Sequence, residues 1–182
     1  MRKIMRKIGR LDHNARLAIC WIFICVVGRL IPHPANFTPL TNLCLFAGSK
    51  LSKRLAFLVI LVALLVSDIT LAYWQGHQVL SSWSIFTYSG FAATVCLGTK
   101  IPNGSKLTTL AYVFASSLGF WIWTNFGTWL CSGMYALTPW GLSNCYLAAL
   151  PFLRNALCGD LVWFGVVFFG FARLKNLAML RV

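Results

Sequence analysis

Apolar residues dominate six stretches of the chain, and short polar segments separate them. The stretches are residues 15–31, 38–51, 55–74, 83–99, 107–130 and 156–172. A run of ~20 apolar residues predicts a helix that spans a membrane, and the second run is short for a span. The segment 141–155 contains Pro151 and precedes the last run. We interpret that segment as a separate re-entrant or interfacial helix.

The composition of the chain indicates that these runs are membrane-spanning helices rather than helices of a soluble core. Of the 182 residues, 59% are hydrophobic and 10% are charged, and the mean hydropathy is +0.75, whereas soluble domains carry about 25% charged residues. The predicted fold class is therefore all-α, a polytopic membrane protein with about six transmembrane helices. A single domain is expected over 15–174, between a basic cytoplasmic tail at 1–14 and a second tail at 175–182.

Charge is distributed unevenly along the chain, and its placement predicts an orientation. The formal net charge is +13. Lys and Arg gather in the N-terminal tail, in the segments near residues 50–54 and 100–106, and in the C-terminal tail. The three other connections carry few of them, which places both termini in the cytoplasm. Basic clusters between apolar runs orient helices rather than form a groove, so nucleic acid is not an expected partner. The N-terminal run is interpreted as an uncleaved first helix, with a secretory signal as the alternative.

Polar residues inside the runs are costly in a membrane and mark candidate sites. At ~1.5 Å per residue, Asp68, Asn125 and Arg29 lie roughly 20–27 Å from the inner ends of their helices. Asp160 lies about 6 Å from the outer end of the last helix on the same measure. All these side chains therefore fall in the outer half of the membrane, which predicts an outward-facing polar pocket.

Each candidate residue also has a structural interpretation. Asp68 and Asp160 are either ligand contacts or members of structural ion pairs with Arg29 or Arg154, and at least one such pair has to join two helices. Trp121 and Asn125 share a helix face and predict a polar, aromatic cavity, whereas Trp129 also fits an interfacial aromatic belt. The remaining candidate ligand-binding residues lie near the outer ends of helices; they are His33, Asn36, Arg154 and Asn155. No catalytic residue, metal ligand or cofactor is predicted.

Smaller features complete the sequence picture. Seven cysteines, mostly inside apolar runs, are interpreted as small buried side chains, with a Cys131–Cys145 bridge as the alternative. Ala111, Ala115 and Gly119 lie four residues apart and form a candidate seam for close helix packing.

The first outer connection is rich in proline. Pro32, Pro34 and Pro39 exclude a helix there and push the preceding residues towards extended geometry. Together with His33, Asn36 and Thr38, the segment could close over the pocket as a cap. The alternative is a stiff turn without a role in binding.

Four stretches carry a resemblance to known proteins: "RLIPHPANFTPLTNLCLFAGSKL", "LAFLVILVALLVSDITL", "TNFGTWL" and "PFLRNALCGDL". Over residues 28–172 the chain resembles an uncharacterised family of small bacterial integral membrane proteins. It is more distantly similar to the substrate-binding S components of energy-coupling-factor transporters. That resemblance implies an S-component-like bundle in the bacterial inner membrane and capture of a vitamin-like micronutrient from outside. It also implies a coupling membrane protein and ATPases as partners. Those proteins dock through Ala-x-x-x-Ala on the first helix, where this chain has Ala15 and Ile19.

Three functions compete at this point. The leading hypothesis is a substrate-binding subunit of a small-molecule uptake transporter, which has no ATP-binding motif of its own. The second is a structural or assembly protein whose buried polar residues only lock helices together. The third is an intramembrane enzyme, because "CGDL" partly matches the Gly-x-Gly-Asp motif of aspartyl intramembrane proteases. The first glycine of that motif and the partner Tyr-Asp motif are both missing, so no enzymatic activity is expected.

Overall fold

The computed structural model describes residues 13–76, 78–102 and 105–169, and this part of the chain is helical, with no strand. The helices are α2 (His13–Leu30), α3 (Leu40–Lys50), α4 (Lys53–Gln75), α5 (Ser84–Gly98), α6 (Lys106–Cys131) and α7 (Pro139–Phe164). A short π-helical turn, η1 (Gly165–Phe169), continues α7. Three segments are long and apolar enough to cross a membrane: α4, α6 and the stretch Pro139–Val167. The all-helical fold is confirmed, and the predicted limits of the runs that became α2, α4, α5 and α6 agree with the helices within about two residues.

Helix α3 lies in the centre of the fold. It packs mainly against α5 and α4, while α2 packs on α4 and α6 pairs with α7. Leu43, Cys44 and Phe46 of α3 are at most 1% exposed. Eleven residues of helix extend only about 16 Å, which is roughly half of a bilayer core of about 30 Å. The second apolar run is therefore short because it forms a core helix, and the non-helical segment 31–39 precedes it.

A close crossing of α3 and α5 explains two glycines. A Cβ atom on Gly48 would lie 2.2 Å from the carbonyl oxygen of Val95, and one on Gly98 would lie 2.4 Å from that of Leu45. The two backbones are therefore in direct contact, which only glycine permits.

The last helix differs from the prediction. Residues 141–155 are not a separate re-entrant or interfacial segment, because α7 runs from Pro139 to Phe164 with Pro151 inside it. The start of the helix is fixed at Thr138, whose hydroxyl accepts a hydrogen bond from the Gly141 N–H, and Pro139 occupies the first turn. Pro151 removes one backbone N–H, which membrane helices tolerate because neighbouring groups replace the lost bond.

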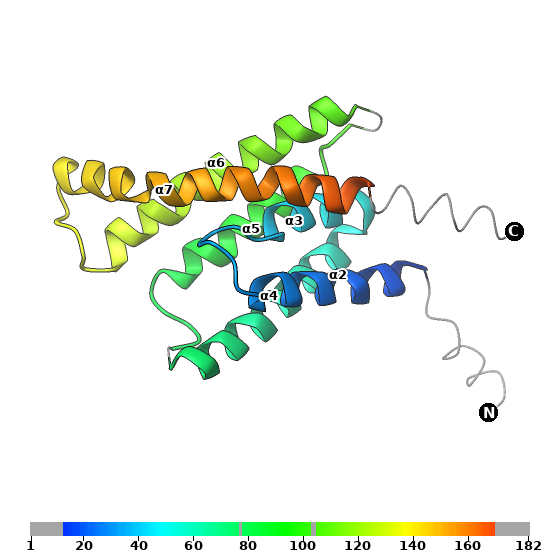
Figure 1. Ribbon diagram of the computed structural model, residues 1–182, viewed down its shortest axis with the longest axis horizontal. Coiled ribbons are helices and arrows are strands. Elements are labelled where there is room, and N and C mark those ends of the chain that lie inside the picture. The colour runs from blue at the N-terminus through cyan, green and yellow to red at the C-terminus, as the bar shows by residue number, and fades with distance from the viewer. Residues whose placement is uncertain (1–12, 77, 103–104, 170–182) are drawn as a thin grey trace, which may run out of the picture.

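The connections alternate between the two ends of the molecule (Figure 1). The basic connections near residues 51–52 and 99–105 lie at the same end as the start of α2 and the end of η1, on the right of the view. The connections at 31–39, 76–83 and 132–138 lie towards the opposite end. We call this the loop end. The arrangement agrees with the charge alternation of the sequence.

Many large apolar side chains point outwards, as expected for helices in lipid. Phe23, Ile85, Leu107 and Leu147 are each more than 60% exposed. All seven cysteines are free thiols, and Cys25, Cys44 and Cys145 are buried. The alternative of a Cys131–Cys145 bridge is therefore wrong, and the interpretation as small buried side chains holds for these three.

Candidate ligand-binding site

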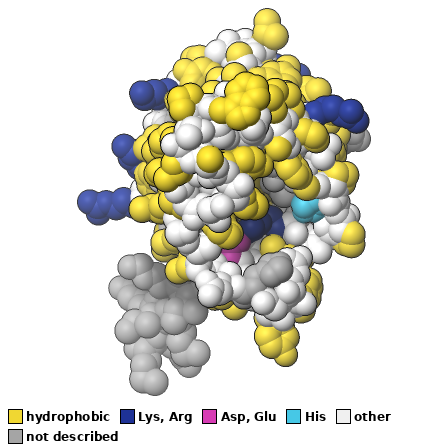
Figure 2. Space-filling model, turned by 90° about the vertical axis from the view of Figure 1, so that its left-hand side faces the viewer, with side chains coloured by type: hydrophobic (Ala, Val, Ile, Leu, Met, Phe, Trp, Pro, Cys, Tyr) yellow, Lys and Arg dark blue, Asp and Glu magenta, His cyan; other side chains and the backbone are white. Residues whose placement is uncertain are grey.

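A cavity of about 240 Å³ lies between helices α2, α3, α5, α6 and α7 and the segment 31–39. We call it the central cavity. Figure 2 shows the loop end, where the surface is hollowed and an acidic and a basic side chain lie together in the hollow. Arg29 lines the cavity, and it is the charged residue among the described lining side chains. Hydroxyl groups of five lining residues surround it: Thr38, Thr41, Thr87, Ser117 and Thr124. Three aromatic rings complete the wall: Phe91, Phe120 and Trp121.

Arg29 is held in place by a polar network behind the cavity. Its Nη1 donates hydrogen bonds to Ser67 Oγ at 2.5 Å and to Asp68 Oδ1 at 2.6 Å. The hydroxyl of Tyr88 donates to the other carboxylate oxygen, Asp68 Oδ2, at 2.7 Å. The Arg29 and Asp68 side chains keep 17% and 18% of their surface exposed. The network joins α2, α4 and α5, so the predicted cross-helix ion pair exists between Arg29 and Asp68.

Asp160 has a different environment. It is 2% exposed and does not line the central cavity. Its Oδ1 accepts from Asn42 Nδ2 at 3.1 Å, and its Oδ2 accepts a short hydrogen bond from Ser117 Oγ. Asn42 also donates to the backbone carbonyl of Asp160 at 3.1 Å. An amide and a hydroxyl therefore replace the arginine expected from the sequence, and this geometry joins α3, α6 and α7 as a lock.

The end of the segment 31–39 packs against the bundle at Phe37 and Pro39, whereas most of residues 31–36 are exposed. Asn36 and Thr38 line the central cavity, and Asn36 has a positive φ of 65°, which asparagine tolerates better than most residues. Phe37 lies against Gly159 of α7, where an added Cβ would be 3.1 Å from its Cα. Pro39 lies against Gly28 of α2 in the same way, at 2.6 Å. The prolines prevent a helix, as predicted, and the segment forms part of the cavity wall.

A second cavity, of about 340 Å³, adjoins the first at Asn36 and Thr124. Asn125 lines it, and its Nδ2 donates to the Trp121 carbonyl at 2.8 Å. Trp121 lines the central cavity and donates from Nε1 to the carbonyl of Ala149 at 3.0 Å. The structure thus brings Arg29, Asn36, Trp121 and Asn125 of the predicted set to two neighbouring cavities.

Other predicted residues lie outside both cavities. The ring of Trp129 donates from Nε1 to the Ala136 carbonyl at 2.9 Å, which fixes the connection after α6. The Nδ1 of His33 bonds the neighbouring Pro34 carbonyl at 2.8 Å. Arg154 is exposed on α7 and Asn155 is half-buried. His77, a second histidine near the predicted outer end of a helix, lies outside the described residues.

Several residues of the site were not predicted. Tyr88, Asn42 and Ser117 bind the two acids and Ser67 accepts a hydrogen bond from Arg29, yet all four are uncharged residues within apolar runs. Serine and tyrosine are common in membrane helices as local backbone partners, so the sequence alone did not separate them from ordinary positions. Ser67 alone had a signal in the sequence, its position before Asp68, whereas the other three lie on different helices from the acid that they contact.

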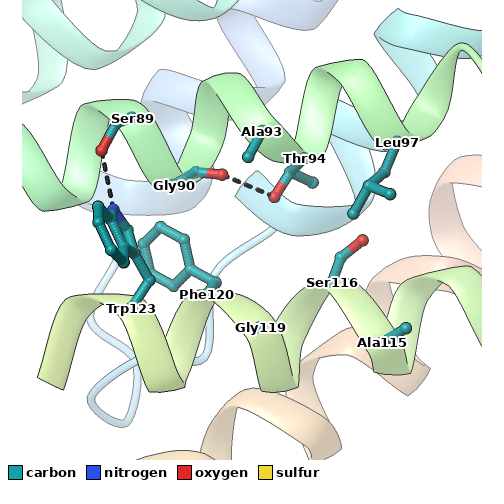
Figure 3. A pocket seen from close by; sticks show the side chains of 10 residues that line it. All are labelled: Ser89, Gly90, Ala93, Thr94, Leu97, Ala115, Ser116, Gly119, Phe120 and Trp123. Atoms are coloured by element: carbon teal, nitrogen blue, oxygen red, sulfur yellow. Dashed lines mark hydrogen bonds between the residues drawn. The ribbon is translucent and has the colours of Figure 1, made fainter. Parts of the chain in front are cut away.

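A third hollow lies between α5 and α6 on the outside of the bundle and is shown in Figure 3. Its floor includes Ala115 and Gly119 from the predicted small-residue seam. A Cβ on Gly119 would meet no described atom within 4 Å, so the seam faces open space rather than a closely packed helix. The close helix approach of this fold occurs instead at Gly48 and Gly98.

Comparisons with known proteins support a family assignment. Searches of curated proteins and of solved structures gave no match. A model of a family of unknown function, DUF6580, matches residues 11–180, which is nearly the whole chain and includes every residue of both cavities. The chain is therefore a member of the DUF6580 family.

Proposed function

We propose that the chain is the substrate-binding membrane subunit of an uptake transporter for a small polar molecule of the vitamin-like kind. The ligand enters from the loop end, which corresponds to the outer face of a bacterial inner membrane with both termini in the cytoplasm. The observation that carries the proposal is the placement of Arg29. A guanidinium fixed by Asp68 and Ser67 lines a cavity beside the segment 31–39. Buried charges in a membrane bundle that reach a cavity commonly mark a substrate path.

The cavity has the features of a small-molecule site. Binding pockets combine apolar and aromatic walls with a few fixed polar groups, typically in volumes of ~300–1,000 Å³. The central cavity, at about 240 Å³, is close to the lower limit, and the adjoining cavity enlarges the available space by about 340 Å³. A coupling membrane protein and ATPases would supply the energy, since the chain carries no nucleotide-binding motif.

Two other functions receive less support. A structural or assembly role is favoured by the buried contact of Asp160 with Asn42 and Ser117, which needs no ligand. It does not explain why the Arg29 side chain lines a cavity. An aspartyl enzyme needs two acids that share one water, whereas Asp68 and Asp160 here bind different partners on different helices.

The test is occupancy of the cavity in the purified full chain. Native mass spectrometry of protein extracted in mild detergent should reveal a bound small molecule. Ala156 lines the central cavity, so Ala156→Phe should fill it and abolish that adduct. Val162→Phe, on an exposed position of the same helix, is the matched control and should keep it. Equal occupancy in the two variants, or none in the unaltered chain grown in rich medium, would favour the structural role.

A further inference from the structure

The charged side chain of the central cavity, Arg29, offers hydrogen-bond donors that are not used within the protein. Both oxygens of Asp68 already accept hydrogen bonds, one from Arg29 and one from Tyr88. In the described part of the chain, the Arg29 guanidinium donates its hydrogen bonds through Nη1. Its Nη2 and Nε groups have no hydrogen-bond partner among the described residues, and the side chain lines the cavity. Arginine donors arranged as a fork match the two oxygens of a carboxylate.

The remaining wall is suited to a flat apolar body. Phe91 and Phe120 have ring centroids 4.3 Å apart, and Trp121 lies next to them on the lining of the cavity. Trp121 is held by its bond to the Ala149 carbonyl, so its ring position is fixed before a ligand arrives. Aromatic rings stack or meet edge to face with other rings at such distances.

Hydroxyl groups without partners add a third feature. Thr38, Thr41 and Thr87 line the cavity, and none of the three makes a side-chain hydrogen bond within the described residues. Thr124 and Ser117, by contrast, bond to carbonyls one helical turn back. The three free hydroxyls can bind polar substituents on a ring.

We propose that the central cavity recognises a small aromatic or heteroaromatic carboxylate. Its carboxylate would pair with the free donors of Arg29, and its ring would lie against Phe91, Phe120 and Trp121. Asp68 and Tyr88 act as positioning residues that orient the guanidinium and do not touch the ligand. This inference rests on the proposed function and narrows it to one class of substrate.

The charge of the central cavity disfavours a cationic ligand. A space of about 240 Å³ holds one ring with its substituents. A cationic ligand would face Arg29 without a carboxylate in the cavity wall to balance it, because Asp68 is paired with Arg29 and does not line the cavity. Like charges brought together out of water are strongly disfavoured.

The experiment compares three probes of one shape and different charge. Benzoate, benzamide and benzylamine are titrated into the full chain in lipid nanodiscs, and binding is followed by calorimetry. Benzoate should bind roughly 10- to 100-fold more tightly than benzamide, as expected for a hydrogen bond to a charged group. Benzylamine should bind most weakly. Arg29→Gln should remove the preference of benzoate over benzamide, whereas Lys53→Gln, which removes one exposed charge at the opposite end, should keep it.

A second variant guards against loss of folding in Arg29→Gln. The pair Arg29→Gln with Asp68→Asn removes both charges at once, so no unpaired carboxylate remains, and its thermal unfolding is measured beside its binding. Equal or tighter binding of benzamide or benzylamine would overturn the carboxylate class while leaving the cavity as a binding site. If none of the three probes binds, the proposal of an aromatic carboxylate as substrate is wrong. If native mass spectrometry also found no adduct, the proposed function would be overturned with it.

Discussion

At the residue scale, two acids of similar sequence context have different environments. Asp68 follows a serine and Asp160 follows a glycine, and both lie in apolar runs. Asp68 pairs with a charged arginine next to a cavity, whereas Asp160 is enclosed by an amide and a hydroxyl. The difference arises from which helices meet at each position. A binding role is therefore better supported at Arg29 than at Asp160.

Asp160→Ala should destabilise the protein. The change removes the carboxylate that accepts from both Ser117 and Asn42 in a buried contact, while each of them keeps one backbone carbonyl as an acceptor. A loss of roughly 1–3 kcal/mol is therefore expected. Asp160→Asn is nearly the same size and keeps an acceptor for Asn42, so a much smaller loss is expected. The unfolding temperature in detergent measures the loss of stability in each of the two variants. Normal stability of Asp160→Ala with loss of a bound ligand would show that Asp160 serves the ligand.

At the element scale, the short helix α3 and the non-helical segment 31–39 before it both line the central cavity. Non-helical backbone at membrane depth is tolerated where it is buried in protein or lines a cavity. The segment meets both conditions, because Phe37 and Pro39 pack against Gly159 and Gly28 while Thr38 lines the central cavity. In Figure 1 it lies nearer the middle of the molecule than the other two connections of the loop end.

Alanine at the glycines of the α3–α5 crossing should separate the two helices. Gly48→Ala places a methyl group 2.2 Å from a backbone carbonyl, so a helix has to move, and a loss of about 1–3 kcal/mol or more is expected. Gly119→Ala is the matched control, since its methyl group meets no described atom within 4 Å. It should be neutral or stabilise α6 by up to ~1 kcal/mol through helix propensity. Similar unfolding temperatures for the two variants would contradict the crossing.

The segment 33–38 should slow the release of a bound molecule. Pro34 within it and the flanking Pro32 and Pro39 limit the conformations of the free chain, so ordering the segment costs little entropy. Replacing residues 33–38 with a Gly/Ser linker of equal length should raise the dissociation rate while the helices still insert. Timed dilution followed by native mass spectrometry measures retention of the adduct. The same replacement at 78–81, in the connection after α4, serves as control. Unchanged retention in the first variant would leave the segment as a plain turn.

At the scale of the whole molecule, the ends of the bundle differ in charge and in access to the cavity. The Lys- and Arg-rich connections lie at one end, and the segment 31–39 with the hollow lies at the other (Figure 1, Figure 2). Basic residues stay on the cytoplasmic side of a membrane. The loop end is therefore expected to face outwards.

Labelling of single cysteines tests this orientation. In a cysteine-free background, positions 35, 78 and 136 are exposed at the loop end and should react with an impermeant maleimide added from outside. Position 52, exposed in the basic connection before α4, and position 103 should react only after the membrane is opened. If position 52 or 103 reacts with the reagent from outside, the proposed topology is wrong.

The sequence by itself determined the helical class, most helix limits and the separation of basic from neutral connections. These properties depend on local composition and on apolar runs, which a single chain displays directly. It also placed Arg29, Asn36, Trp121 and Asn125 near one polar region, because rise per residue gives depth along a helix.

Only the tertiary structure decided which side chains meet. Depth along a helix says nothing about rotation or neighbours, so the pairing of Arg29 with Asp68, and of Asp160 with Ser117 and Asn42, could not be read from the chain. For the same reason, the sequence could not show that α3 lies in the core. Its run is short in sequence, and packing between α4 and α5 supplies the burial that makes an 11-residue helix stable. Continuity of α7 through Pro151 likewise depends on neighbours, because a proline removes a bond that only surrounding groups can replace.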